Sequence, residues 1–407
     1  MKTWTKRLWG RRAALVVALV AIVAGLQGAA LAADSAPERQ NVIEVAPGVV
    51  YWAVDVPSRG GTARAHVIQV DLTNPNVSLD LLYPGVVAAA QPLSQMVEAS
   101  GAVAAVNADF FNISATQPGV VPTNAPVGPA IAGGVTLKAA VPTAQRFGPS
   151  LPSGATVEDV IGVGEDGIAR LDRLTLHGEI VTPSGTYPLA GLNQYAIAQG
   201  GIAAFNSLWG STSRGRTVCG NDRRREDPCS TNVYEVTVAD GRVVSVSNQP
   251  GSGRIPEGTL VLIGREAGAD RLRSLQVGDP VTVTYELRSA SGRPLRFAAG
   301  GQPLVRDGRA VPGLDNATVA IRSGAGISAD GRTLHFFALD GAAAGMTYAE
   351  VAAFLLSLGA YSGINLDGGG SSTLVVRLPG DGSVAVMNRP AAEQRPIPNG
   401  IGVFVAP

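Results

Sequence analysis

The stretch Gly363–Val376 places the strongest constraint on how this chain can fold, because it joins a short strand, three consecutive glycines and three hydroxyl residues. Asn365 and Asp367 alternate with Ile364 and Leu366, which is the pattern of a half-buried strand. Consecutive glycines cost backbone entropy, so they are expected where the chain takes positive φ or approaches a ligand closely. The amides of such a turn can also bind an anion. A polar turn between two core strands is the alternative, but the placement of Asn365 and Asp367 on one face favours a functional site.

The N-terminus has the features of a secretory signal peptide. Five basic residues precede the apolar run Ala13–Leu26, and Ala30-Leu31-Ala32 has the form of a cleavage site. The apolar run is short for a membrane span. We therefore expect residues 1–32 to be a signal peptide, the protein to be secreted or extracytoplasmic, and the mature chain to have no membrane span.

The charge balance argues against a nucleic-acid partner. Five of the 32 basic residues lie in the expected signal peptide, so the chain after it carries 27 basic and 32 acidic residues. A mildly negative protein without a basic patch interleaved with aromatic residues is a poor ligand for polyanions.

The pattern of short apolar runs and frequent turn residues predicts an α+β protein, with a mixed, mostly antiparallel β-sheet and few helices. One helix is expected over Pro92–Ala99. The clearest helix follows Thr347, which forms a capping box with Glu350, and Gly359 stands at its expected end. After the signal peptide we expect an N-terminal part (33–156), a β-rich middle block (157–297) and a C-terminal part (298–407). The middle block is either an inserted module or part of the same sheet.

Two further segments stand out. Cys219 and Cys229 flank a charged loop, and a lone cysteine pair in a secreted protein predicts one disulfide. Without a nearby histidine the pair is a poor zinc site.

Gln117–Gly154 is rich in proline and glycine and has little regular pattern, and loops of that length are uncommon unless they are functional or mobile.

Polar residues recur at the ends of apolar runs far apart in the chain. We expect Asn107, Arg322, Asn365, Asp367 and Arg395 to line one cleft. No lysine follows the glycines as in a Walker A loop, and neither a nucleophile elbow nor a dinucleotide fingerprint is present. The full candidate set contains carboxylates, guanidiniums, amides and hydroxyls: Asn107, Asp109, Arg322, Asp340, Asn365, Asp367, Gly368, Gly369, Gly370, Ser371, Ser372, Thr373 and Arg395. Carboxylates and arginines together suit acid–base or nucleophilic chemistry on a sugar beside an anion.

The stretch Asn365–Thr373, Asn-Leu-Asp-Gly-Gly-Gly-Ser-Ser-Thr, resembles the signature of the phosphodiester glycosidase family. Asn107 with Phe110-Phe111 resembles that family's Asn-Gly-x-Phe-Phe segment, and Arg322 and Arg395-Pro396 match two of its arginines. There are departures: Ile321 stands where the family has proline, and Ala108-Asp109 replaces Gly-Gly. The resemblance is strongest over Gln302–Val405.

The resemblance implies a hydrolase that cleaves the glycosidic bond of a sugar-1-phosphodiester, which is a small molecule or part of a cell-envelope glycan, without cofactor or metal. Asp367 would act on the sugar as base or nucleophile, with Asn365 beside it, and Arg322 and Arg395 would hold the phosphate. The remaining candidates would bind the substrate. Two alternatives are a non-enzymatic carbohydrate- or wall-binding protein, and a metal-dependent phosphodiesterase with Asp109, Asp340 and Asp367 as converging ligands.

Overall fold

The computed structural model describes residues 38–380, 382–390 and 393–406. The expected signal peptide (1–32) lies outside these residues, so it stays a prediction, and secretion with it. Within the described residues no helix is both long and apolar enough to cross a membrane.

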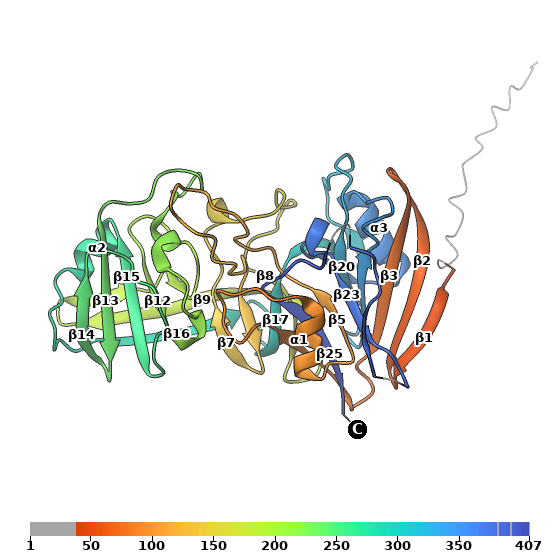
Figure 1. Cartoon of the computed structure of the whole chain (residues 1–407), viewed down its shortest axis with the longest axis horizontal. Coiled ribbons are helices and arrows are strands. Elements are labelled where there is room, and N and C mark those ends of the chain that lie inside the picture. Colours follow the sequence, from red (N-terminus) through yellow and green to blue (C-terminus); the bar gives the residue numbers. More distant parts are fainter. Residues whose placement is uncertain (1–37, 381, 391–392, 407) are drawn as a thin grey trace, which may run out of the picture. The chain divides into compact units, whose positions relative to one another are not determined.

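The largest sheet has eight strands in the order β1-β2-β3-β21-β20-β22-β18-β19, and every neighbouring pair is antiparallel. The strands are β1 (Gln40–Ala46), β2 (Val49–Ser58), β3 (Gly61–Asp71), β18 (Gln302–Arg306), β19 (Arg309–Ala310), β20 (Ser323–Ile327), β21 (Thr333–Leu339) and β22 (Ser362–Asn365). Helix α3 (Tyr348–Ser357) lies beside this sheet (Figure 1) and contacts β18, β20 and β22. Its capping box between Thr347 and Glu350 confirms the sequence prediction, and Gly359 follows its end with φ +85°.

A second, five-stranded sheet is also antiparallel and has the order β24-β23-β5-β25-β4. Its strands are β4 (Val77–Leu82), β5 (Ala104–Asn107), β23 (Leu374–Arg377), β24 (Val384–Val386) and β25 (Gly400–Val405). Helix α1 (Leu93–Ser100) packs on it through Leu93, Met96 and Val97, which confirms the helix expected over Pro92–Ala99.

The core lies on both faces of the eight-stranded sheet, because successive side chains of a strand point to opposite faces. On β2, Tyr51 belongs to the same apolar cluster as Ile68 and as Val106 and Ile401 of the five-stranded sheet. Its neighbour Trp52 belongs to the apolar cluster around α3. The two sheets therefore pack face to face, and α3 covers the outer face of the larger one.

The remaining strands form two sheets. The first has the order β10-β9-β8-β17-β6-β7, with β16 paired to β9; the second has the order β11-β12-β15-β13-β14. Their bounds are β6 (Ala130–Ala132), β7 (Val135–Lys138), β8 (Asp159–Gly164), β9 (Ala169–Thr182), β10 (Gly185–Pro188), β11 (Gly191–Leu192), β12 (Ile202–Phe205), β13 (Val233–Ala239), β14 (Arg242–Ser247), β15 (Thr259–Arg265), β16 (Thr282–Ser289) and β17 (Leu295–Gly300), with a short helix α2 (Ala267–Leu272) and short 3₁₀ turns η1 (Thr143–Gln145), η2 (Ser207–Trp209), η3 (Arg214–Val218) and η4 (Gly369–Ser371). Strands β11 and β12 are parallel. The predicted α+β class with mostly antiparallel sheets is confirmed, whereas the predicted division into domains stays a prediction.

Candidate active site

A cavity of about 260 Å³ opens beside the turn that follows β22. Its walls come from segments far apart in the chain: Phe110, Phe111, Ile113, Phe147–Pro149, Ala320–Arg322, Asp367–Gly369 and Arg395. The volume is near the lower end for ligand pockets, which measure about 300–1,000 Å³. Arg322, Asp367 and Arg395 of the expected cleft thus face one cavity.

Each glycine of the Asp-Gly-Gly-Gly turn meets a separate steric demand. A Cβ on Gly368 would lie 2.4 Å from the carbonyl oxygen of Ile321, and one on Gly370 would lie 2.5 Å from the Arg395 guanidinium. Gly369 has φ +58°, which L-residues with side chains rarely adopt. Any side chain here would push Asp367 or Arg395 out of place, so the triple glycine is explained by close packing around the cavity.

Backbone bonds join this turn to the other polar segments. The amide of Asp367 donates to the carbonyl of Ala108 at 2.8 Å, and the amide of Gly369 donates to the carbonyl of Ile321 at 2.8 Å. Asn107 donates through Nδ2 to the carbonyl of Asp367 at 2.6 Å and accepts at Oδ1 from the amide of Thr373 at 3.0 Å. The turn is therefore held by strand ends from both main sheets.

The two asparagines lie behind the cavity wall and do not line it. Asn107 and Asn365 are each 1% exposed. Asn365 donates to the carbonyl of Leu366 at 2.8 Å, and its Oδ1 is buried without a hydrogen-bond partner in the described part of the chain. Their geometry supports positioning of the Asp367 turn, and the direct role expected for Asn365 stays a prediction.

Asp367 is partly exposed to the cavity. Burial raises its pKa from the usual value to about 7, although a hydrogen bond from Ser371, the amide of Gly368 and the charge of Arg395 oppose the rise. The charge of Asp109 adds to it. A carboxyl group with this pKa can both accept and release a proton near neutral pH, which suits acid–base catalysis.

The guanidinium of Arg322 is held rigidly. Its Nε and Nη2 donate to the carbonyls of Met346 and Thr318, both at 3.1 Å, and its Cζ lies 4.4 Å from the centre of the Tyr348 ring. Burial lowers its pKa, but an arginine stays charged. The two carbonyls use two of its five N–H donors. The positively charged guanidinium keeps three other N–H donors, and Arg322 lines the cavity together with Asp367.

Arg395 completes the charged lining. It is partly exposed, donates through Nη1 to the hydroxyl of Ser371 at 3.2 Å and lies against Gly370. The cavity therefore holds one carboxyl group with a raised pKa and two guanidiniums.

The three hydroxyl residues after the glycines are buried, with exposures of 0%, 1% and 0% for Ser371, Ser372 and Thr373. The hydroxyl of Ser372 lies 2.6 Å from that of Ser323 and donates to the carbonyl of Arg322 at 3.1 Å. These hydroxyls brace the wall from behind. Their expected contact with the substrate stays a prediction that this geometry does not favour.

Asp109 and Asp340 have protein partners of their own. Asp109 is buried and accepts from the amide of Gly128 at 2.6 Å; burial raises its pKa, and the positive charge of Lys138 opposes this. Asp340 is buried, accepts from Arg389 Nε at 3.1 Å and lies 3.7 Å from His66 Nε2. Neither lines the cavity. Among the described residues, no group of three or more His, Cys, Asp or Glu is placed to hold a metal ion.

The sequence does not mark Phe147–Pro149 as part of a site, although this segment forms one cavity wall and lies in the unusually long loop Gln117–Gly154. Nothing in the sequence indicates a role for Tyr348 in the site, since it is the first residue of an amphipathic helix. Its hydroxyl donates to Gln302 Oε1 while its ring supports Arg322. Aromatic residues in loops and helix starts become recognisable as site residues only when their neighbours are known.

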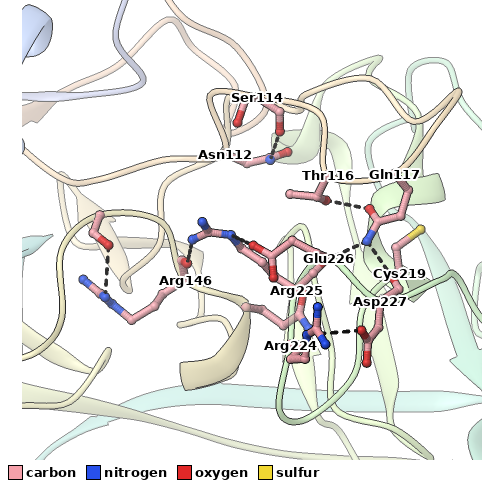
Figure 2. Close-up of polar contacts among 12 residues, drawn as sticks. Asn112, Ser114, Thr116, Gln117, Arg146, Cys219, Arg224, Arg225, Glu226 and Asp227 are labelled. Atoms are coloured by element: carbon pink, nitrogen blue, oxygen red, sulfur yellow. Dashed lines mark hydrogen bonds and ion pairs between the residues drawn. The ribbon is translucent and has the colours of Figure 1, made fainter.

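The predicted disulfide between Cys219 and Cys229 is present and supports this wall. Figure 2 shows Arg225, inside the disulfide loop, donating to the carbonyl of Arg146 at 2.6 Å. The Arg225 guanidinium also lies 4.5 Å from the centre of the Phe147 ring. Gln117 bonds the carbonyls of Arg225 and Asp227 at 2.6 and 2.8 Å. The disulfide loop is thus bonded to Arg146, which precedes the cavity-lining Phe147, and to Gln117 at the start of the same long loop.

Residues 232–404 match the family model described as phosphodiester glycosidase. The matched segment is therefore similar to phosphodiester glycosidase domains, and it includes Arg322, Arg395 and the whole Asn365–Thr373 signature. The match begins inside the β-rich middle block, earlier than the resemblance in Gln302–Val405, and it does not include Asn107 or Phe110-Phe111. A search of curated proteins found no match.

Solved structures share the fold. A hypothetical protein from Synechocystis is 24% identical with a TM-score of 0.69, over 92% of this chain and 65% of the other, so this chain spans less than two thirds of that protein. A putative exported protein from Burkholderia pseudomallei is 22% identical with a TM-score of 0.63, over 84% of this chain and 74% of the other. The catalytic domain of zebrafish N-acetylglucosamine-1-phosphodiester alpha-N-acetylglucosaminidase, auto-inhibited by its pro-peptide, is 14% identical with a TM-score of 0.43, over 91% of this chain and 87% of the other. The first two of these matches show the fold and not the activity, and no argument rests on the third, whose TM-score is lower.

Proposed function

We propose that the protein is a glycosidase that hydrolyses the bond between a sugar and the phosphate of a sugar-1-phosphodiester. The observation that carries this proposal is the joint placement of Asp367, with its pKa raised to about 7, and of Arg322 and Arg395 around one cavity. The similarity of residues 232–404 to the phosphodiester glycosidase family model supports the same reaction class.

In the proposed reaction water attacks the anomeric carbon while Asp367 takes one of its protons. The bond between the anomeric carbon and the phosphate oxygen breaks, and its electron pair leaves with the phosphate. The products are the free sugar and the phosphomonoester of the alcohol. Charge grows on the departing phosphate, where Arg322 and Arg395 stabilise it. Since phosphate leaves as an anion, a separate strong general acid is not required. Attack by Asp367 itself, followed by hydrolysis, is the other route open to this carboxylate.

The walls of the cavity suit the sugar. Phe110, Phe111 and Phe147 are apolar and buried, so together they offer a surface for the apolar face of a sugar ring and keep bulk water away from Asp367. Excluding water strengthens the pairing of the phosphate with the arginines, because Coulomb interactions grow as the effective dielectric constant falls.

Hydrolysis in ¹⁸O-labelled water tests the proposal. Cleavage at the anomeric carbon places the label in the sugar, whereas a phosphodiesterase that attacks phosphorus places it in the phosphate. We expect label in the sugar, with and without a chelator. Loss of activity with chelator together with labelled phosphate would favour the metal-dependent phosphodiesterase. Binding measured by calorimetry without any turnover would favour a carbohydrate-binding protein.

We further propose that the protein is exported and that its substrate, a small-molecule phosphodiester or a cell-envelope glycan, lies outside the cytoplasm. The pattern of residues 1–32 supports export. N-terminal sequencing of the protein recovered from outside the cytoplasm tests this, and we expect the first residue to be Ala33. A cytoplasmic protein that retains Met1 would contradict it.

A further inference from the structure

A second cavity, of about 320 Å³, shares Arg322 and Pro149 with the first. One of its walls is the loop Pro149–Ser153, and another is the segment Gly313–Asp315 with Thr318. Tyr348, on which Arg322 stacks, also lines it. Arg322 therefore borders two cavities. The sequence predicted only one cleft around Arg322, and the family match does not assign a role to either cavity.

A phosphodiester has two arms joined at one phosphate, which is the shape that this arrangement fits. The Arg322 guanidinium is anchored by two backbone carbonyls and the Tyr348 ring, so its position between the cavities is fixed. A phosphate paired with Arg322 can extend one arm into each cavity. Asp367 lines the first cavity, so the sugar arm belongs there and the other arm belongs in the second cavity.

The lining of the second cavity indicates the chemistry of that other arm. Ser150, Ser153 and Thr318 offer hydroxyl groups, and Leu151, Leu314 and the Tyr348 ring offer apolar surface beside them. Asp315 adds a negative charge. Hydrogen bonds from Thr318 and from the amide of Ala317 lower its pKa to about 2, so it is charged at every pH of interest.

From this geometry, and resting on the proposed function, we infer that the second cavity is the subsite for the alcohol part of the phosphodiester. It takes a small alcohol that carries hydroxyl groups, uncharged or cationic, such as a polyol. An acidic alcohol is disfavoured because its charge would face Asp315. A long acyl chain is disfavoured because a cavity of about 320 Å³ is too small to enclose it.

Three substrates with the same sugar test this inference: the methyl, glyceryl and glyceric-acid phosphodiesters. We expect the wild-type protein to have the highest kcat/KM for the glyceryl substrate and the lowest for the acidic one. Asp315→Asn keeps an oxygen for the amides of Ala317 and Thr318 but removes the charge. It should raise the ratio of kcat/KM for the acidic substrate to kcat/KM for the methyl substrate by about fivefold, as expected for one exposed charge pair.

Asp330→Asn is the matched control. Asp330 is also exposed and accepts a backbone amide within a turn, but that turn lies at the opposite end of β20 from Arg322. Its kinetic constants should equal those of the wild type for all three substrates. A second variant, Ser153→Trp, adds bulk to the lining of the second cavity and should raise KM for the glyceryl and glyceric-acid substrates more than for the methyl substrate.

Equal kcat/KM for the three substrates, or equal effects of Asp315→Asn and Asp330→Asn, would overturn this inference while leaving the proposed function intact. If the wild-type protein hydrolysed none of the three substrates, the proposed function would fail and this inference would fail with it.

Discussion

At the scale of single residues, Asp367 is the group on which the proposed chemistry depends. Asp367→Asn keeps the shape of the side chain and removes the base, so kcat should fall by about 10²–10⁴-fold, the usual contribution of general acid–base catalysis. Steady-state kinetics on a sugar-1-phosphodiester measures this. If a folded Asp367→Asn protein kept a kcat near that of the wild type, the carboxylate would have no catalytic role, and Asp109 would become the next candidate.

The same substitution should affect stability in a pH-dependent way. The pKa of Asp367 in the folded protein, about 7, lies above the value of about 3.9 in an unfolded chain. The folded state therefore loses stability as the pH rises through 7, because the buried carboxyl group must ionise. Asp367→Asn should melt at the wild-type temperature near pH 3 and at a higher temperature above pH 7. If Asp367→Asn and the wild type melted at the same temperature both near pH 3 and above pH 7, the raised pKa of Asp367 would be contradicted.

The pH dependence of the rate tests the link between Asp367 and Arg395. If Asp367 acts as a base, kcat/KM should rise with pH and level off above about 7. The charge of Arg395 lowers the pKa of Asp367, so Arg395→Gln should move this inflection to higher pH. A pH–rate profile of each variant measures the shift. An unchanged inflection in Arg395→Gln would mean that another group controls the profile.

Arg322 should contribute mainly in the transition state. Arg322→Gln removes a charge that stabilises the leaving phosphate, so kcat should fall by about 10²–10³-fold with a smaller change in KM. Arg322→Lys should recover little of the kcat that Arg322→Gln loses, because lysine cannot bond both the Met346 and Thr318 carbonyls while stacking on Tyr348. A rise in KM alone would show that Arg322 only binds the substrate.

At the scale of elements, the disulfide loop supports the aromatic wall of the cavity. Closing a loop over a sequence separation of 10 stabilises a protein by about 3 kcal/mol at most in the chain-entropy model. The double variant Cys219→Ser/Cys229→Ser should therefore be less stable and should also have a higher KM, because Arg225 would no longer hold Phe147. Denaturant unfolding and kinetics on the same preparations measure both effects.

Arg225→Ala separates the two effects, because it leaves the disulfide in place and removes the contacts to Arg146 and Phe147. It should raise KM with little loss of stability. Arg224→Ala is the matched control, since the Arg224 side chain is 71% exposed and forms its ion pair with Asp227 inside the same disulfide loop. Equal KM values for the two variants would show that the loop does not position the wall.

At the scale of the whole molecule, the cavity is assembled by several segments that approach one another only in the folded chain. A non-hydrolysable phosphonate analogue should slow hydrogen exchange in peptides containing Ala108–Phe111, Phe147–Pro149, Ile321–Ser323 and Asp367–Ser371 together. The hairpin β13–β14, which lines neither cavity, should be unaffected and serves as the control. Protection of only one of the four segments would contradict a shared site.

Much of the fold could be predicted because its signals are local. The capping box of α3, the helix α1, the disulfide and the antiparallel strands follow from spacings of a few residues. The importance of the Asp-Gly-Gly-Gly turn was also evident from the sequence. The reasons for its three glycines were not, because the Ile321 carbonyl and the Arg395 guanidinium approach it from distant segments.

The sequence by itself determined which residue types were available for the chemistry: one carboxylate in a glycine turn and arginines at the ends of apolar runs. Only the tertiary structure decided that Arg322, Asp367 and Arg395 face the cavity, while Asn107, Asn365 and Ser371–Thr373 lie behind it. It also decided that Phe147 and Tyr348 belong to the site. The physical reason is that backbone preferences act over a few residues, whereas burial, and with it the pKa of Asp367, depends on the packing of segments far apart in the chain.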